Sequence, residues 1–545
     1  MPVVTIKMLT LHSAIPTTMI SQILLPIFAT ILFYVLFHTL PIVYRELTSP
    51  LRHMAGPENP SLLVGNSQEM MEDPNLTDKW RSQFGRTFRF KGIFSISELH
   101  TSDIKAIQHI ISNSAVYRRA PFARARSALL TGNGILSVDL DNHKRFRRIV
   151  ASSIHRPLLG EKVLTEIFIE EAIQLRDIWA QKVQEDGRIE VISWLRLATL
   201  DVIGKAGFNH DFHALVPDKK PNELNEVLKQ LFLSPHTNRY NIFRLAQSHI
   251  PILGLIPLPG KRLFMTARSK MYSIGQQILE STKAGIGSEK DFAGKRDLLS
   301  ALLRANLSTE IPANQRLSDR ELISQIPTFF VAGHETTSLA ASWALHALSV
   351  NATAQTKLRE ELLTISTDNP TMDELNSLPY LEKVVRETLR IYSPVTSRHR
   401  MAMREDVLPL SEPYRDQQGN LHHSLVIPKG QTIYIPILAV NTDKDIWGPD
   451  SKEWKPERWD EVPEAVSAIP SVWGNLLTFF AGPHNCVGFR FAVLEVKVLL
   501  FTIIRAFEVQ KGGPNRTHSG VAPTSHRSRR RRREVKLAHH FQSVQ

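Results

Sequence analysis

The stretch "FFAGPHNCVGFRFA", from Phe479 to Ala492, contains Cys486, the only cysteine among 545 residues. A lone cysteine excludes an intramolecular disulfide and every metal site that is built from several thiolates. Helical periodicity begins three residues later, at Phe489, so the thiol precedes a predicted helix N-terminus. The unpaired amide groups of that terminus should lower the pKa of Cys486 and stabilise its thiolate.

A single thiolate could act as a nucleophile or as a metal ligand. A nucleophile needs a base in contact, and His484 lies only two residues away, where neighbours usually point apart. One thiolate is a sufficient ligand where the other ligands come from elsewhere, as in haem, whose porphyrin supplies four nitrogens. Gly482 and Gly488 would let the backbone approach a flat macrocycle, and His484 could donate a hydrogen bond to a propionate. The remaining alternative is an inert cysteine that packs as a small hydrophobe.

The N-terminal region predicts a membrane anchor. No charged residue occurs between Lys7 and Arg45, and the apolar run 20–40 is long enough to cross a membrane as a helix. A cleaved signal peptide is the alternative, but the run is long for one and no clear cleavage site follows it. Basic residues after the run place the remainder in the cytosol. We therefore predict a short segment 1–19, an anchor 20–44, a proline-rich hinge 45–62, a catalytic domain 63–511 and a basic tail 512–545.

The composition indicates a large globular body, because 42% of the residues are apolar and 22% are charged. The net charge is +13, and five of these charges lie in one run, 529–533. This balance suits a solvated surface or a docking face for an acidic partner or an anionic membrane. The chain shows neither a basic stripe interleaved with aromatic residues nor zinc-finger spacing, so nucleic-acid binding is not expected.

The body is mostly helical by periodicity. Its longest helix candidate is 318–350, where Ser318 and Glu321 form a predicted capping box and Pro327 should kink or loosen the first turns. This helix is apolar on nearly all sides, so it should cross the core. The segment 421–441 predicts two short strands around a Pro–Lys–Gly turn.

The last 34 residues, 512–545, lack strand alternation and read as a disordered basic tail. One hypothesis for this segment is a shifted reading frame or an unspliced intron, which sequencing of the transcript would test.

Four motifs, in order along the chain, carry a resemblance to the cytochrome P450 family. Phe479, Gly482, Cys486 and Gly488 match its Phe-x-x-Gly-x-x-x-Cys-x-Gly haem-binding signature. The others are "AGHETT" at Ala332–Thr337, "ETLR" with Glu387 and Arg390, and "PERW" with Arg458. The resemblance runs from the proline hinge to about Val509. It implies a mainly α fold with small β-sheets (α+β), the cytochrome P450 fold, behind an N-terminal transmembrane helix, with Cys486 as the axial ligand of haem iron.

The motif "AGHETT" resembles the oxygen-activating helix of that family. Thr336 lies four residues after Ala332 on one helical face, so its hydroxyl can bond to the backbone and open a groove. Ala332 and Gly333 would leave room for haem and a diatomic ligand. By the resemblance, Thr336 and Glu335 are the catalytic residues that relay protons from solvent.

Two further groups of residues take roles from the resemblance. Glu387, Arg390 and Arg458 would form a buried ion network that holds the haem-side core. His143, Arg147 and Arg400 would reach the haem propionates. The nearby Lys144, Arg145 and Arg148 would face outward, on the side where the family docks an acidic flavoprotein reductase.

The predicted function is that of a haem-thiolate monooxygenase with a lipophilic small-molecule substrate. It would use dioxygen and electrons from NADPH through NADPH-cytochrome reductase, with cytochrome b5 as a further candidate donor. Local sequence segments resemble those of fungal microsomal members of the family. This resemblance suggests a location in the endoplasmic reticulum membrane and a role in secondary metabolism, with a terpenoid as one substrate class. By resemblance the pocket is lined by residues 122–136, 207–255, 329–330, 332 and 395–397.

Two alternatives remain from the sequence. One is a haem-thiolate isomerase or dehydratase of peroxides that needs no reductase. The other is an inactive haem-binding protein, which only the atypical C-terminus favours.

Overall fold

The computed structural model describes residues 17–73, 76–155, 161–216, 226, 261–284, 297–307, 311–511 and 533–537. The chain divides into two compact units, residues 1–52 and residues 53–545, and each is described by itself.

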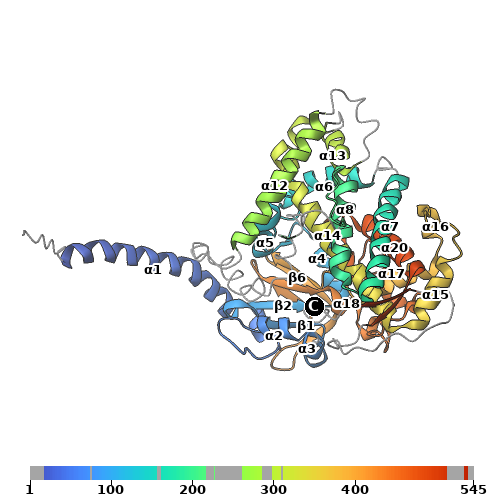
Figure 1. Cartoon of the computed structure of the whole chain (residues 1–545). Helices are drawn as coiled ribbons and strands as arrows, with labels where there is room; N and C mark the ends of the chain where they lie inside the picture. Colours follow the sequence, from blue (N-terminus) through green and yellow to red (C-terminus); the bar gives the residue numbers. More distant parts are fainter. Residues whose placement is uncertain are drawn as a thin grey trace, which may run out of the picture. The chain divides into compact units, whose positions relative to one another are not determined.

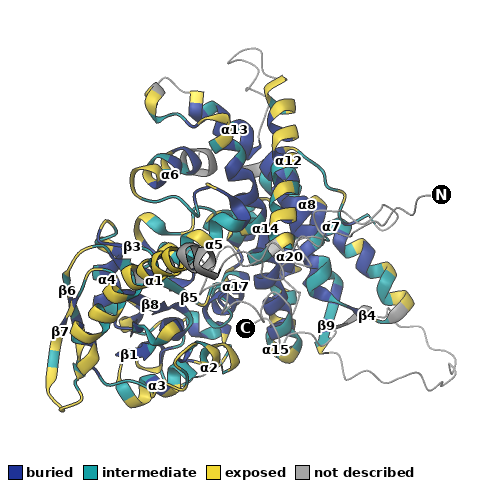
Figure 2. Ribbon diagram, turned by 90° about the vertical axis from the view of Figure 1, so that its left-hand side faces the viewer, coloured by how far each residue is buried: buried dark blue, intermediate teal, exposed yellow. Residues whose placement is uncertain are grey.

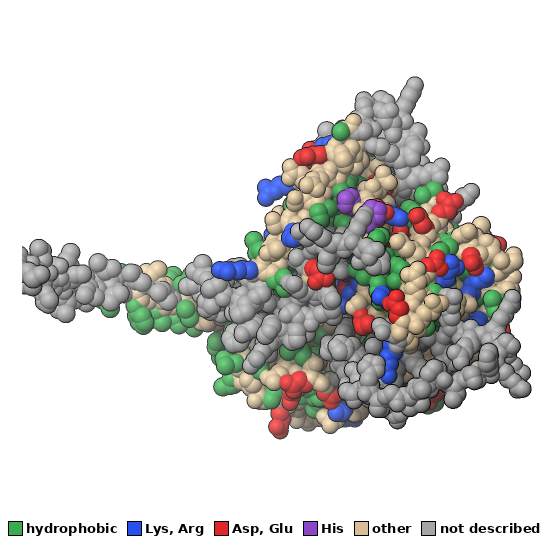
Figure 3. Space-filling view, in the orientation of Figure 1, with side chains coloured by type: hydrophobic (Ala, Val, Ile, Leu, Met, Phe, Trp, Pro, Cys, Tyr) green, Lys and Arg blue, Asp and Glu red, His purple; other side chains and the backbone are tan. Residues whose placement is uncertain are grey.

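The first unit is dominated by helix α1 (Thr17–Thr48), which contains Pro26 and Pro41. Its part Phe28–Thr48 is long and apolar enough to cross a membrane, with a mean hydropathy of 1.4 and no burial within the structure. Figure 3 shows apolar side chains exposed along this helix. The helix continues four residues into the predicted hinge, because no helix breaker follows Pro41 until Pro50.

The second unit is mainly helical, as predicted, and its helices surround one long central helix (Figure 1). In chain order they are α2 (Ser67–Glu72), α3 (Leu76–Phe84), α4 (Ile104–Ser112), α5 (Pro121–Thr131), α6 (Leu140–His155), α7 (Glu161–Asp186), α8 (Val191–Phe208), α12 (Lys261–Ala284), α13 (Leu298–Leu307), α14 (Asp319–Val350), α15 (Ala352–Leu362), α16 (Met372–Asn376), α17 (Pro379–Ile391), α18 (Ile437–Asn441), α19 (Lys444–Trp447) and α20 (Phe489–Ala506).

The largest sheet has five strands in the order β1-β2-β8-β5-β3. They are β1 (Thr87–Lys91), β2 (Ser97–Thr101), β8 (Thr432–Pro436), β5 (Ser397–Ala402) and β3 (Tyr117–Arg119). The β2–β8 pair is parallel and the others are antiparallel. A second sheet pairs β6 (Asp406–Arg415) with β7 (Leu421–Ile427). The two strands predicted around Pro428 are thus confirmed as β7 and β8, although they belong to different sheets.

The third sheet has the order β4-β10-β9 and is parallel throughout. It joins β4 (Arg188–Ile189) and β9 (Phe507–Lys511) to β10 (Arg533–Leu537). Strand β10 lies inside the segment 512–545, for which the sequence predicts disorder without strands. That prediction is wrong for these five residues, because their backbone pairs with two strands that are distant in the sequence.

Helix α14 forms the centre of the core, as predicted for residues 318–350. Most of its residues are buried, and it contacts α8, α12 and α20 (Figure 2). The predicted capping box is confirmed: the Glu321 amide donates to the Ser318 hydroxyl, and the Ser318 amide donates to the Glu321 carboxylate at 2.9 Å. The helix continues without interruption through Pro327.

Candidate active site

The loop before α20 places the lone thiol. The 3-10 turns Leu477–Phe479 and Gly482–His484 lead into it, and the Cys486 amide donates to the Phe479 carbonyl at 2.8 Å. Gly482 has φ +66°, and a Cβ there would lie 2.6 Å from Cγ2 of Ile111. Its absent side chain therefore serves the turn and the packing against α4, and its role beside a macrocycle stays a prediction. At Gly488 a Cβ would meet no atom within 4 Å, so this position leaves room for a ligand.

The Cys486 thiol keeps accessible surface although protein surrounds it, as expected for a side chain in the wall of an internal cavity. Burial raises the pKa of the thiol above its usual value, and the Gly488 amide, Arg398 and Arg147 only partly offset this effect. The sequence predicts a lowered pKa from the helix terminus, and that prediction is wrong because burial in the protein outweighs the amide and the cations.

Two histidines and three arginines gather beside this loop. His143 of α6 stacks on His484, with ring centres 4.1 Å apart. Burial, together with the nearby Arg119, Arg147 and Arg400, lowers the pKa of His484 to about 2 and that of His143 to about 4. We call these five residues the basic cluster. Both histidines are therefore neutral near pH 7, while the guanidinium groups keep their charge.

The arginines of the basic cluster are held mostly by carbonyl groups. Arg147 donates to the main-chain carbonyl of Asn485 at 2.7 Å and also to its side-chain oxygen. Arg119 donates to the Leu136 carbonyl at 2.5 Å, and Arg400 donates to the carbonyl of the adjacent His399 at 3.0 Å. These carbonyl groups are neutral, so the positive charges of the three arginines are not balanced by them.

One carboxylate lies near this cluster, that of Asp139, and it lies 3.6 Å from Arg124. The structure brings the predicted His143, Arg147 and Arg400 together. It adds Arg119 and Asn485, which sequence reasoning missed. Arg119 lies opposite Arg400 in the β3–β5 ladder, a pairing that no local sequence pattern reveals.

Thr336 forms the hydrogen bond that its spacing predicts. Its hydroxyl donates to the Ala332 carbonyl at 2.6 Å. Ala332 is exposed although it lies in the middle of a core helix, so this face of α14 borders an accessible space. At Gly333 a Cβ would lie 3.0 Å from Cδ1 of Ile203, so this glycine allows α8 to pack closely against α14. Its role in leaving room for haem stays a prediction.

The predicted pocket residues Phe329 and Phe330 are buried in the core. Phe330 packs on Phe208 and Phe212, with ring centres 4.8 and 5.4 Å apart. They stabilise the α8–α14 contact, and their place in a pocket wall stays a prediction. Of the other predicted lining, residues 217–225 and 227–255 lie outside the described residues.

Glu335 is bound by a residue that the sequence did not reveal. Arg196 of α8 is buried, and both of its contacts go to the Glu335 carboxylate, one of them between Nε and Oε2 at 3.0 Å. This bidentate pair fixes the carboxylate on the α8 side of α14. The pair joins positions 139 residues apart in the sequence, so no motif signals it.

The three predicted network residues meet in a fully paired arrangement. Arg390 donates to both oxygens of Glu387, at 2.8 and 2.7 Å, and Nε of Arg458 lies 3.4 Å from the same carboxylate. Glu387 also accepts from the Trp459 indole at 3.1 Å, and Arg458 donates to Asp450 at 2.6 Å. All three predicted residues are buried. We call them, with Asp450, the ion network.

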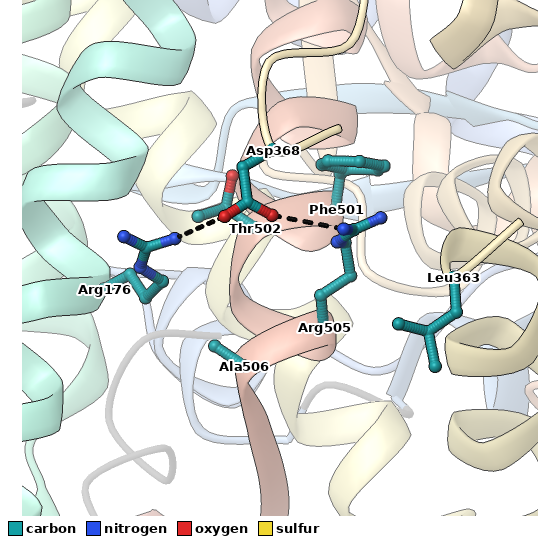
Figure 4. Close-up of a pocket in the computed structure, with 7 residues that line it drawn as sticks. All are labelled: Arg176, Leu363, Asp368, Phe501, Thr502, Arg505 and Ala506. Atoms are coloured by element: carbon teal, nitrogen blue, oxygen red, sulfur yellow. Dashed lines mark hydrogen bonds and ion pairs between the residues drawn. The ribbon is translucent and has the colours of Figure 1, made fainter. Parts of the chain in front are cut away.

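A separate cavity of about 220 Å³ lies at the far end of α20 from the thiol. In it Asp368 lies between Arg176 and Arg505, at 3.2 and 3.1 Å (Figure 4). Its lining comes from residues 176, 363, 368, 501, 502, 505 and 506 and includes none of the predicted site residues.

The site thus combines an accessible thiol, a neighbouring basic cluster and an exposed face of the core helix α14. The Cytochrome P450 family model matches residues 55–521, and the chain belongs to the cytochrome P450 family. It is a monooxygenase, as its relatives are.

Several curated relatives match nearly end to end. The chain is 43% identical over 499 residues to Cytochrome P450 monooxygenase 128 of Postia placenta, covering 89% of this chain and 91% of the relative. It is also 43% identical over 483 residues to Cytochrome P450 monooxygenase 205 of the same fungus, covering 87% and 88%. Cytochrome P450 monooxygenase claP of Ampulloclitocybe clavipes is 32% identical over 499 residues, covering 90% of each chain.

The residues present fit the haem that this family carries. Among the described residues the buried His484 Nδ1 atom has no hydrogen-bond partner, and the basic cluster offers cations in excess of carboxylates. The Cys486 thiol and the open space at Gly488 lie on the same loop. A ligand with two carboxylates and a metal that accepts a thiolate matches this set of donors.

Proposed function

We propose that Cys486 supplies the axial thiolate of a haem, and that Arg119, Arg147, Arg400 and the two histidines hold its propionates. The observation that supports this most is the surplus of arginines, with Arg400 buried, beside an accessible lone thiol, because a charge is costly to bury without an anion. When bound, a thiolate-ligated haem supplies dioxygen activation and the oxidation of a substrate C–H bond.

Thr336 and Glu335 would deliver protons in this reaction. The Thr336 hydroxyl faces the accessible side of α14, and its bond to the Ala332 carbonyl keeps it in place. Glu335 must exchange its contact with Arg196 for water before it can carry a proton inward. Arg196 would thus set how readily this carboxylate moves.

The partner for electron transfer would be NADPH-cytochrome reductase, with cytochrome b5 as an accessory donor. Lys144 is 77% exposed, and its one ion pair among the described residues is a 3.6 Å contact with the exposed Asp141, so its charge can still steer an acidic partner. Arg145 is engaged instead with Glu321 and the Arg316 carbonyl, and Arg148 with Gln315. Of the three predicted docking cations, Lys144 is therefore the one that we propose for this role.

We also propose that α1 anchors the enzyme in the endoplasmic reticulum membrane as a single span, with the catalytic unit in the cytosol. The exposed apolar surface of Phe28–Thr48 supports the anchor. A chain that begins after residue 44 should appear in the soluble fraction, whereas the full chain should pellet with membranes.

The substrate would be a lipophilic small molecule of fungal secondary metabolism, with terpenoids as one class to test. The 43% identity to two monooxygenases of the fungus Postia placenta supports the fungal monooxygenase class, within which this substrate is to be sought.

The experiment that tests the function reconstitutes the full chain with a reductase in liposomes and follows NADPH consumption and product. The proposal expects oxidation products that require both NADPH and the reductase. Turnover of peroxides without a reductase would instead identify an isomerase or dehydratase. A haem-loaded protein that consumes no NADPH with any tested lipophilic compound would contradict monooxygenase activity.

A further inference from the structure

Two buried side chains between α8 and α14 carry polar atoms without a hydrogen-bond partner. Both ring nitrogens of His334 lack a partner among the residues that the structure describes, and so does Nη1 of Arg196. Both residues are buried, so bulk solvent does not reach these atoms. Buried polar atoms without a protein partner are rare in native proteins and often mark a bound water molecule.

The fold brings these two side chains together. Helices α8 and α14 pack along each other (Figures 1 and 2). The Thr199 hydroxyl lies between their main chains, 3.3 Å from the Arg196 carbonyl and 3.1 Å from the His334 carbonyl. The Arg196 carbonyl and guanidinium group both act on the His334 ring. His334 and Arg196 therefore face each other across the contact between the two helices, beside Glu335.

Arg196 depends on one carboxylate, which has to move in the proposed reaction. Its Nε and Nη2 atoms bind Glu335, the only acidic residue that pairs with it in the described part of the chain. The Glu335 side chain is 17% exposed and that of Arg196 only 4%. The carboxylate can thus turn toward solvent, whereas the guanidinium group stays buried. Leaving a buried charge without its partner is costly, so this pair resists separation.

His334 offers Arg196 a contact that does not depend on Glu335. Burial, together with the charge of Arg196, lowers the pKa of His334 to about 3, so the ring is neutral near pH 7. A neutral imidazole has one N–H donor and one acceptor nitrogen. A water molecule that accepts from Nη1 of Arg196 and donates to the acceptor nitrogen of His334 would satisfy both atoms.

This inference rests on the proposed proton delivery by Glu335 and deepens it. We propose that an ordered water bridges Nη1 of Arg196 to the His334 ring, and that His334 is a positioning residue that allows Glu335 to leave Arg196. The bridge keeps the guanidinium group partly solvated while the carboxylate turns to solvent and takes up a proton. His334 itself transfers no proton and touches no substrate.

A crystal structure of the haem-loaded full chain tests the water directly. We expect density for one water within about 3.2 Å of both Nη1 of Arg196 and a ring nitrogen of His334. The absence of a water at this position would overturn the proposal.

Two variants of His334 test its role. His334→Leu removes the acceptor, so product formed per NADPH consumed should fall about three- to tenfold, the range that one hydrogen bond corresponds to. The solvent isotope effect on product formation, measured in D2O, should increase because Glu335 is released less easily. His334→Gln keeps an acceptor oxygen and should recover most of the wild-type value.

The matched control is His100→Leu. His100 of β2 is also buried, and neither of its ring nitrogens has a hydrogen-bond partner among the described residues. It stacks on Phe88 and Tyr434, away from Glu335. Its replacement should change neither the product formed per NADPH nor the solvent isotope effect.

A double-mutant cycle tests whether His334 acts through Arg196. In Arg196→Gln no guanidinium group holds Glu335, so adding His334→Leu should cause no further loss of product per NADPH. An equal additional loss in that background would overturn the proposal.

Other results would also overturn it. They are wild-type coupling in His334→Leu, an equal loss in His334→Gln and His334→Leu, and a loss that comes with lower haem content and an unchanged isotope effect. The last result would show a purely structural role. A failure of the proposed function is recognised separately, since the wild-type protein would then form no product that requires NADPH and the reductase.

Discussion

The ion network and the basic cluster are two buried groups of charges with opposite balance. In the ion network Glu387 binds two arginines, and the second arginine also binds Asp450, so every charge has a partner within the protein. In the basic cluster Arg119 and Arg400 share the Asp139 carboxylate, which also pairs with Arg124, and Arg147 forms no ion pair among the described residues. A complete set of partners indicates a structural role, whereas a surplus of one sign indicates a site that a ligand completes.

The largest effect should come from Glu387→Ala. It leaves Arg390 and Arg458 buried without their carboxylate, which should destabilise the fold by about 3–5 kcal/mol and prevent haem loading. Denaturant unfolding and haem content measure the loss. Glu360→Ala on the exposed side of α15 is the control, with an expected change within about 0.5 kcal/mol. Normal haem occupancy in Glu387→Ala would contradict the structural role that we assign to the ion network.

Arg400→Leu should have the opposite effect to Glu387→Ala, because it should spare the stability of the fold and weaken haem binding. Burial and the neighbouring Arg119 and Arg398 lower the pKa of Arg400 to about 9, so its charge is a burden in the haem-free protein. We expect unchanged or slightly higher stability without haem. Haem affinity should fall about 10- to 100-fold, because one charge-assisted contact is lost. A variant that unfolds more easily and binds haem normally would place Arg400 among the structural residues.

Thr336→Ala tests the accessible face of α14. Haem content and stability should stay near wild type, while product formed per NADPH consumed should fall about tenfold or more, as expected for a lost proton-transfer group. Ser342→Ala removes a hydroxyl that makes the same kind of bond on the same helix, to the Ser338 carbonyl at 2.7 Å, and is the matched control. Unchanged coupling in Thr336→Ala would exclude Thr336 from proton delivery.

The last comparison concerns pH and His143, because its effect appears only below neutral pH. The pKa of this histidine is lowered from 6.5 to about 4, so the unfolded chain takes up a proton at a higher pH than the folded chain. The stability of the haem-free protein should therefore be complete above about pH 6.5 and fall by about 1.4 kcal/mol per pH unit toward pH 4. Haem propionates would favour the charged ring and weaken this dependence.

Urea unfolding at pH 7 and pH 5, with and without haem, measures this effect. His143→Phe keeps a ring against His484 and should lose the slope that His143 contributes. An identical slope in that variant would show that other groups cause the acid sensitivity.

The sequence was sufficient where a motif and its partner lie close together. Glu387 and Arg390 are three residues apart, Ser318 and Glu321 likewise, and Thr336 follows Ala332 by one helical turn. In these cases the helix alone dictates the contact. The fold class followed from helical periodicity and from the spacing around Cys486.

The sequence was insufficient where tertiary packing decides. Arg196 reaches Glu335 from another helix, and Arg119 meets Arg400 only through sheet pairing. Gly333 packs closely against Ile203 and Gly482 against Ile111, and only the folded chain brings these residues together.

The thiol and strand β10 show the same limit. A helix terminus is visible in the sequence, but the burial that raises the pKa of Cys486 is not. The sequence of strand β10 lacks a clear alternation of apolar and polar residues, and the strand forms by pairing with β4 and β9.

The central claim is that Cys486 completes a haem site, and the carbon monoxide difference spectrum of the reduced protein tests it most directly. The full chain should show the red-shifted Soret band of thiolate ligation, and Cys486→Ser should lose that band while the exposed position leaves the fold intact. A wild-type spectrum without the shift, or a Cys486→Ser variant that retains it, would contradict the account.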